Sequence, residues 1–112
     1  MLIYHNPRCS KSRQGLAILK ELNQDFEIVE YLKNPPTQEE LSSIIKKLQI
    51  KPIELVRKNE VIWKENYKGK ELSDEQIIKA MVKNPKLIER PIVITNDSAI
   101  VGRPPENIKN IL

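Results

Sequence analysis

The chain's only cysteine, Cys9, lies in a short basic segment that could carry nucleophilic chemistry. A short apolar run at 2–4 precedes this segment, and apolar residues with helical spacing follow it at 16–19. The pattern predicts a strand, a tight loop and the first turn of a helix, with Cys9 at the junction of loop and helix. The nucleophilic form of cysteine is the thiolate, which helix N-termini and neighbouring cations favour. We therefore expect Cys9 to be a reactive thiol rather than a small core residue.

Several groups near Cys9 in the sequence favour ionisation of its thiol. The unpaired N–H groups of a first helical turn carry partial positive charge, and the basic residues Arg8, Lys11 and Arg13 lie close by. The same N–H groups could hold an oxyanion beside the sulfur. His5, the only histidine, suits either a modulating role or a simple hydrogen bond within the loop. A lone cysteine and a lone histidine cannot complete a tetrahedral metal site, so we expect no metal.

Length and composition limit the class of protein. The 112 residues predict one domain, numbered 1–112, with a core of Ile, Leu and Val because aromatic residues make up only 4%. No apolar run approaches the roughly 20 residues of a membrane span, and no signal-peptide pattern is present. A single cysteine forms no internal disulfide, and Ser12 stands where a CxxC motif needs its second cysteine. We expect a cytoplasmic monomer with no membrane partner.

The positively charged residues divide into two groups. The chain has a formal net charge of +4, and its lysines are scattered as on a solvated surface. They form no stripe with interleaved aromatics, so we expect no nucleic-acid partner. Besides the two arginines near Cys9, the arginines Arg57, Arg90 and Arg103 stand at loop-like positions beside the ends of expected elements. This usage favours bidentate anion recognition, although ordinary ion pairing is an equal alternative.

The periodicity predicts an α/β architecture in three parts. A helix over about 10–23 and an alternating strand over 26–31 complete a right-handed βαβ unit with parallel strands. A helical insertion follows at about 36–88. Its helices start at the capping boxes Thr37–Glu40 and Ser73–Gln76 and at Pro52, whereas the polar stretch 60–72 gives no clear pattern. Trp63 and Tyr67 within that stretch are expected to pack together. Two short strands at 92–95 and 99–101 then form a hairpin before a closing helix.

Three segments in this order resemble the ArsC family of glutathione- and glutaredoxin-dependent arsenate reductases. The similarity covers essentially the whole chain; the three segments are 4–13, 55–59, and 90–93 taken with 102–104, and the turn at 31–36 also resembles that of the family. The resemblance implies a thioredoxin-like fold with a helical insertion and a mixed four-stranded sheet.

The resemblance also implies roles for individual residues. Cys9 corresponds to the nucleophile that attacks arsenic, and His5 and Ser12 correspond to residues that modulate its thiolate. Pro91 stands where proteins of this fold place a cis proline opposite the cysteine. The oxyanion would be bound by Arg57, Arg90 and Arg103.

A single cysteine cannot resolve its own sulfur adduct, so an external thiol must complete the cycle. The resemblance supplies glutathione as co-substrate and glutaredoxin as protein reductant, with no bound cofactor. The implied reaction converts arsenate to arsenite through a thiol–arsenate ester on Cys9.

Two alternatives remain open at this point. The first is a redox-responsive transcription regulator like Spx, which shares the fold and binds RNA polymerase, although Ser12 removes the CxxC switch typical of such proteins. The second is a reductase of the same fold with another substrate, because Arg8 and Lys11 make the loop more basic than in the best-established arsenate reductases of this type. The chain also ends soon after the last motif, whereas longer family members continue.

Overall fold

The computed structural model describes all 112 residues, which form two compact units. The first unit combines Met1–Asn34 with Arg90–Leu112, and the second is Pro35–Glu89. The second unit occupies the stretch for which the sequence predicts a helical insertion. The prediction that residues 1–112 behave as one domain stays a prediction.

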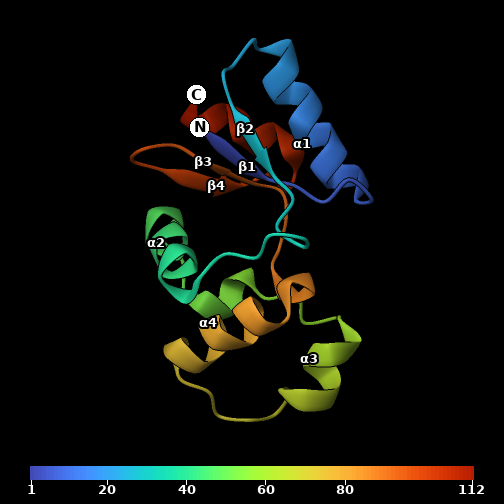
Figure 1. Ribbon diagram of the computed structural model, residues 1–112, viewed down its shortest axis with the longest axis vertical. Coiled ribbons are helices and arrows are strands. Elements are labelled where there is room, and N and C mark those ends of the chain that lie inside the picture. Colours follow the sequence, from blue (N-terminus) through green and yellow to red (C-terminus); the bar gives the residue numbers. More distant parts are fainter. The chain divides into compact units, whose positions relative to one another are not determined.

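The first unit is built on the mixed four-stranded sheet that the sequence predicts (Figure 1). The strands follow the order β2-β1-β3-β4 in the sheet. Strand β1 pairs in parallel with β2 and antiparallel with β3. Strand β3 in turn pairs antiparallel with β4. The four strands are β1 (Leu2–Tyr4), β2 (Glu27–Val29), β3 (Ile92–Ile94) and β4 (Ala99–Val101). The predicted parallel βαβ unit and the predicted hairpin are therefore both confirmed.

Helix α1 (Ser10–Glu21) connects β1 to β2 and is slightly shorter than predicted. It ends because the chain turns at Leu22 and enters the left-handed conformation at Asn23, where φ is 52°. Strand β2 is also shorter than the predicted 26–31. Glu30 already belongs to a turn, in which its carbonyl oxygen accepts hydrogen bonds from the N–H groups of Lys33 and Asn34. As an edge strand, β2 leaves Ile28 47% exposed rather than buried.

The core of the first unit lies between the sheet and two helices. Ile3 of β1 and Val93 of β3 are cross-strand partners with no exposed surface, and they pack with Leu19 of α1. Ile108 completes the cluster from the closing helix η3 (Pro105–Ile111), which is 3₁₀ rather than α-helical. Helices α1 and η3 contact each other and supply the same buried cluster, so they cover one face of the sheet (Figure 1).

Helix α1 approaches the start of β3 as closely as a glycine allows. A Cβ atom placed on Gly15 would lie 2.9 Å from Cγ of Pro91 and 2.9 Å from Cδ1 of Ile108. A Cβ atom on Gly102, which follows β4, would meet the same two residues at 2.9 and 3.0 Å. The glycines therefore allow the helix that begins at the cysteine to pack directly against Pro91.

We expect Gly15→Ala to destabilise the protein. Alanine improves helix propensity by roughly 1 kcal/mol, but overpacking a filled core typically costs about 1–3 kcal/mol, and the rigid Pro91 ring cannot rotate away. Urea unfolding should show a net loss of about 1 kcal/mol, whereas the exposed neighbour Gln14→Ala should stay within about 0.5 kcal/mol of wild type. An alanine variant as stable as wild type would contradict this account of the contact.

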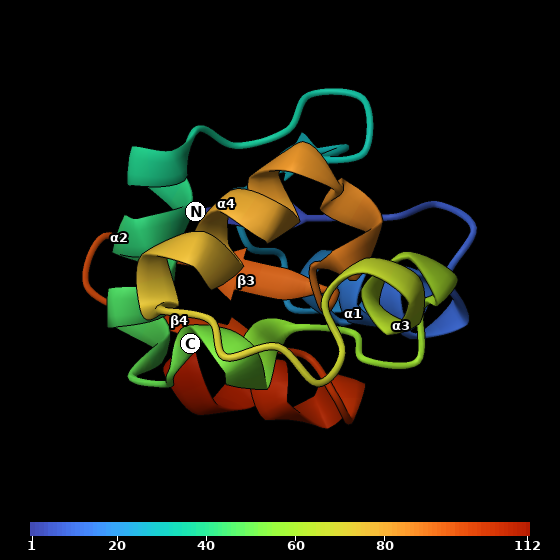
Figure 2. The same ribbon diagram turned by 90° about the horizontal axis from the view of Figure 1, so that it is seen from below.

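The second unit is entirely helical apart from one isolated bridge between Val56 and Ile88. Both predicted capping boxes are present: Thr37 and Glu40 exchange hydrogen bonds of 3.1 Å, and Ser73 and Gln76 do so at 2.8 and 3.2 Å. Helices α2 and α4 lie side by side (Figure 2). The helices are α2 (Gln38–Leu48), η1 (Pro52–Leu55), α3 (Val61–Asn66), α4 (Asp74–Lys83) and η2 (Pro85–Leu87).

The stretch 60–72, which gives no clear pattern in the sequence, contains α3 and, directly after it, Tyr67. The rings of Trp63 and Tyr67 stack with centroids 5.3 Å apart, as expected from their spacing. Asn84, at the end of α4, donates a hydrogen bond of 3.2 Å to the Tyr67 hydroxyl. Nowhere in the chain does a helix combine the length and apolarity needed to cross a membrane.

Candidate active site

The loop that carries Cys9 is held by its own hydrogen bonds. The Cys9 N–H donates to the Asn6 carbonyl oxygen at 3.0 Å, and the Asn6 side-chain oxygen accepts from the Arg8 N–H at 3.0 Å. Nη1 of Arg13, one turn into α1, donates to the Pro7 carbonyl oxygen at 2.9 Å. Cys9 itself is the N-cap residue of α1, as the sequence predicts. The loop thus fixes the cysteine where the N–H groups of the helix start are unpaired.

The pKa of the Cys9 thiol is lower than that of an ordinary cysteine. Partial burial opposes ionisation, but the backbone N–H groups of Ser12 and Lys11 and the guanidinium of Arg90 stabilise the thiolate more strongly. Arg90 acts both by a hydrogen bond and by its charge. The charges of Arg8 and Arg13 are not among the main causes. The sequence was therefore right about the helix N-terminus, but the cation that matters comes from the far end of the chain.

His5 and Ser12 form a buried pair at the two ends of the cysteine loop. Nδ1 of His5 lies 2.6 Å from the Ser12 hydroxyl oxygen, which also accepts the Asn6 N–H at 2.9 Å. Burial lowers the pKa of His5 below its usual value, although the Glu30 carboxylate and a hydrogen bond at Ser12 oppose this. The imidazole is therefore mainly neutral near pH 7. Any influence of His5 on the thiol has to pass through hydrogen bonding at Ser12 rather than through a positive charge.

The lowered pKa of Cys9 predicts a measurable pH dependence. Alkylation by iodoacetamide reports the thiolate, and the single cysteine makes the signal unambiguous. In the folded protein, reactivity should persist to lower pH than in the urea-unfolded chain and fall only as the pH drops through the folded-state pKa. The ionised thiol stabilises the folded protein at pH values above the pKa of the unfolded state. This stabilisation is lost as the pH falls through the pKa of the folded state. Equal midpoints for folded and unfolded chains would show that the fold does not favour the thiolate.

Arg90 and Arg103 belong to the same part of the first unit. Arg90 directly precedes Pro91, whose peptide bond is cis, as the family resemblance implies. The Gly102 N–H donates to the Pro91 carbonyl oxygen at 2.8 Å and so brings the backbone of Arg103 beside the cis proline. A second cis bond joins Arg103 to Pro104, and Asn107 donates to the Arg103 carbonyl oxygen at 3.1 Å.

Arg57 belongs to the second unit. Its N–H donates to the Leu87 carbonyl oxygen at 2.7 Å. Its guanidinium lies 3.6 Å from a carboxylate oxygen of Glu60 and 3.6 Å from one of Glu89. Within this unit Arg57 therefore takes part in ion pairs, the alternative that the sequence left open. The role of Arg57 in binding an oxyanion stays a prediction.

Sequence reasoning missed the residues that hold the site together. Asn6 organises the cysteine loop, and Gly15 and Gly102 allow close packing against Pro91. One signal was available for Asn6, because an asparagine before a proline commonly starts a turn. The approach of Gly15 and Gly102 to the same proline is visible only in the structure. The second cis bond, before Pro104, had no signal beyond the proline itself.

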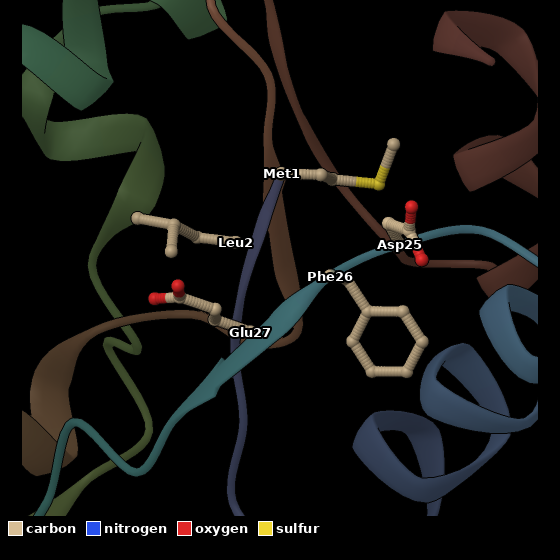
Figure 3. Close-up of a pocket in the computed structure, with 5 residues that line it drawn as sticks. All are labelled: Met1, Leu2, Asp25, Phe26 and Glu27. Atoms are coloured by element: carbon tan, nitrogen blue, oxygen red, sulfur yellow. The ribbon is translucent and has the colours of Figure 1, made fainter.

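A hollow of about 350 Å³ lies at the other end of the parallel strands from Cys9 (Figure 3). It is lined at the start of β1 by Met1 and Leu2 and at the start of β2 by Asp25, Phe26 and Glu27. In open α/β sheets, ligands bind beyond the carboxyl ends of strands, where Cys9 follows β1. The position of this hollow therefore argues against its being the active site.

Comparison with known proteins relates the whole chain to one family. The model of the ArsC family matches residues 4–111. The uncharacterized protein YfgD of Escherichia coli K12 is 48% identical, with 98% of this chain and 94% of that protein aligned. A protein named arsenate reductase from Neisseria meningitidis serogroup A is 41% identical, with 98% and 96% aligned.

A solved structure, described as an arsenate reductase from Vibrio cholerae, superimposes with a TM-score of 0.94. It is 42% identical, and the match covers 99% of this chain and 96% of that one. The α/β fold with its mixed four-stranded sheet is accordingly the thioredoxin-like fold of these proteins. The family match, the full-length relatives and the shared fold agree, and the chain belongs to the ArsC family.

Proposed function

We propose that this protein is an arsenate reductase that uses Cys9 as nucleophile and takes its electrons from glutathione and glutaredoxin. The observation that carries the proposal is the thiol of Cys9 at the start of α1, with its pKa lowered by first-turn N–H groups and by Arg90. The relatives named arsenate reductase that align over nearly the full length of the chain support the choice of substrate. The same reasoning favours a cytoplasmic enzyme, where glutathione keeps thiols reduced.

In the first step, the Cys9 thiolate attacks the arsenic of arsenate. An S–As bond forms, and one arsenate oxygen takes up two protons and leaves as water, so arsenic stays pentavalent. Negative charge builds up on the remaining oxygens in this step. Arg90 is suited to stabilise this charge, because a guanidinium stays ionised and can donate to two oxygens at once. We assign Arg57 and Arg103 the same task of binding oxyanion oxygens.

External thiols then complete the reduction, because the chain has no second cysteine. The glutathione thiol replaces a hydroxyl group on arsenic, releases water and forms a second S–As bond. A glutaredoxin thiolate attacks the glutathione sulfur; an S–S bond forms, and the electron pair of the broken S–As bond reduces arsenic to the trivalent state. Water finally displaces the Cys9 sulfur, which releases arsenite and restores the thiol.

His5 and Ser12 are proposed to position and modulate the thiolate through the hydrogen bond that joins them. The Ser12 hydroxyl oxygen accepts from the Asn6 N–H, so the cysteine loop, the serine and the imidazole are connected by hydrogen bonds. Pro91 is proposed as the residue opposite the sulfur, since Gly15 of α1 packs against its ring.

The deciding experiment is a coupled assay. Arsenate, glutathione, glutaredoxin and glutathione reductase are combined with the protein, and NADPH consumption is followed. Arsenate-dependent consumption that requires all components supports the proposal. No turnover with arsenate, combined with binding to RNA polymerase, would instead support the regulator alternative, and turnover of another oxyanion alone would show a reductase with a different substrate.

A further inference from the structure

We propose that a hollow beside the cysteine loop binds the thiol co-substrate as an anionic peptide, with Arg8 and Lys33 holding its carboxylates. This inference rests on the proposed function, because that function requires an external thiol. It adds a binding site for that thiol on residues outside the oxyanion set.

The hollow has the size and position that such a ligand requires. Its volume is about 390 Å³, within the usual range for pockets that bind small molecules. One wall is the loop that leads to the nucleophile, and the other is the turn that follows β2. The lining residues are His5, Asn6, Pro7, Arg8, Glu30, Leu32 and Lys33.

The loop wall connects the hollow directly to Cys9. Pro7 and Arg8 immediately precede the cysteine, and the Cys9 N–H is hydrogen-bonded to the Asn6 carbonyl oxygen. A peptide seated in the hollow therefore lies within one short loop of the reacting sulfur.

The charges in the hollow complement those of glutathione. The tripeptide has two carboxylates and one ammonium group, whereas the hollow offers two cations, Arg8 and Lys33, and one carboxylate, Glu30. The Arg8 guanidinium makes no hydrogen bond or ion pair in the structure, and the hydrogen bond of Arg8 to Asn6 comes from its backbone N–H. Lys33 meets Glu30 at 3.8 Å, but its side chain is 77% exposed, so this weak pair exchanges easily for a ligand carboxylate. Leu32, 37% exposed, supplies an apolar surface.

Two other hollows do not suit an anionic ligand. The one at the start of β1 and β2 has two carboxylates, Asp25 and Glu27, and no lysine or arginine side chain (Figure 3). The one at the start of α2 is lined by Thr37, Gln38 and Glu39. The hollow beside the cysteine loop therefore combines cationic side chains with proximity to Cys9, and these two hollows do not.

Direct binding tests the site without any arsenate. S-Methylglutathione cannot react, so its titration followed by NMR should shift the backbone signals of residues 5–8 and 30–33. The double variant Arg8→Ala/Lys33→Ala should weaken this binding about tenfold, because two charge-assisted contacts are lost. The control Lys86→Ala/Lys109→Ala removes the same net charge at exposed positions outside the hollow and should bind as wild type does. Equal weakening by both double variants, or no shifts in wild type, would overturn the proposal.

Kinetics then separates this proposal from the proposed function. In the coupled assay, Arg8→Ala/Lys33→Ala should raise KM for glutathione about tenfold and leave KM for arsenate and the pKa of Cys9 unchanged. Turnover supported by 2-mercaptoethanol, which has no carboxylate, should be equally fast in both proteins; it is followed as arsenite release, because glutathione reductase does not recycle this thiol. Arsenate turnover with an unchanged KM for glutathione would refute the site alone. Binding of S-methylglutathione at the hollow without any arsenate turnover would refute the proposed function and leave the site standing.

Discussion

Cys9→Ser is expected to abolish arsenate turnover, leaving only the background rate of the assay mixture. A serine hydroxyl keeps the size and position of the thiol, but it does not ionise near neutral pH in the absence of a strong base. The first-turn N–H groups and Arg90 lower the pKa of the thiol in the wild-type protein. They cannot activate residue 9 in the variant, because the serine forms no thiolate. The measurement is arsenate-dependent NADPH oxidation in the coupled assay, with circular dichroism to show that the variant is folded.

Ser10→Ala provides the matched control for this experiment. Ser10 is exposed, directly follows Cys9 and makes no hydrogen bond through its side chain, so its loss changes the neighbourhood of the sulfur but not the proposed chemistry. Ser10→Ala should therefore keep turnover close to that of wild type. Turnover by Cys9→Ser at the wild-type rate would refute the nucleophilic role of the cysteine outright.

Arg90→Ala is expected to lower kcat/KM for arsenate and to raise the pKa of Cys9 in the same protein. Hydrogen bonds to charged groups contribute about 1.5–3 kcal/mol, so their loss corresponds to roughly a tenfold to hundredfold decrease. Two effects combine here, because fewer thiolates are present at neutral pH and the oxyanion loses a donor. The pH profile of kcat/KM should accordingly move to higher pH, together with the midpoint of iodoacetamide labelling.

Two further variants distinguish the guanidinium from simple positive charge. Arg90→Lys keeps the charge but loses the planar fork, so we expect it to restore the pKa of Cys9 more fully than it restores kcat/KM. Lys109→Ala removes one positive charge from an exposed position on η3 in the same unit and should change neither quantity appreciably. An unshifted pKa of Cys9 in Arg90→Ala would contradict the electrostatic account of the site.

Local signals in the sequence were sufficient to predict most of the elements. The two capping boxes could be predicted because each involves residues only three positions apart in the sequence. Both are present in the structure. The parallel β1–β2 pair followed from a strand, a helix and a strand joined by short connections. Element ends were less accurate: β2 is limited to Glu27–Val29, because the turn at Glu30 forms hydrogen bonds that periodicity does not encode.

The sequence by itself determined that the single cysteine stands at the start of a helix, since it lies between an apolar run and a helical pattern, and this position is the basis for proposing it as the nucleophile. Only the tertiary structure decided what ionises that cysteine. Arg90 reaches the sulfur because β3 pairs with β1 and Pro91 packs against Gly15, whereas Arg8 and Arg13, so close in sequence, contribute little. Burial likewise lowers the pKa of His5. Electrostatic interactions depend on distance and burial in space, and spacing along the chain specifies neither.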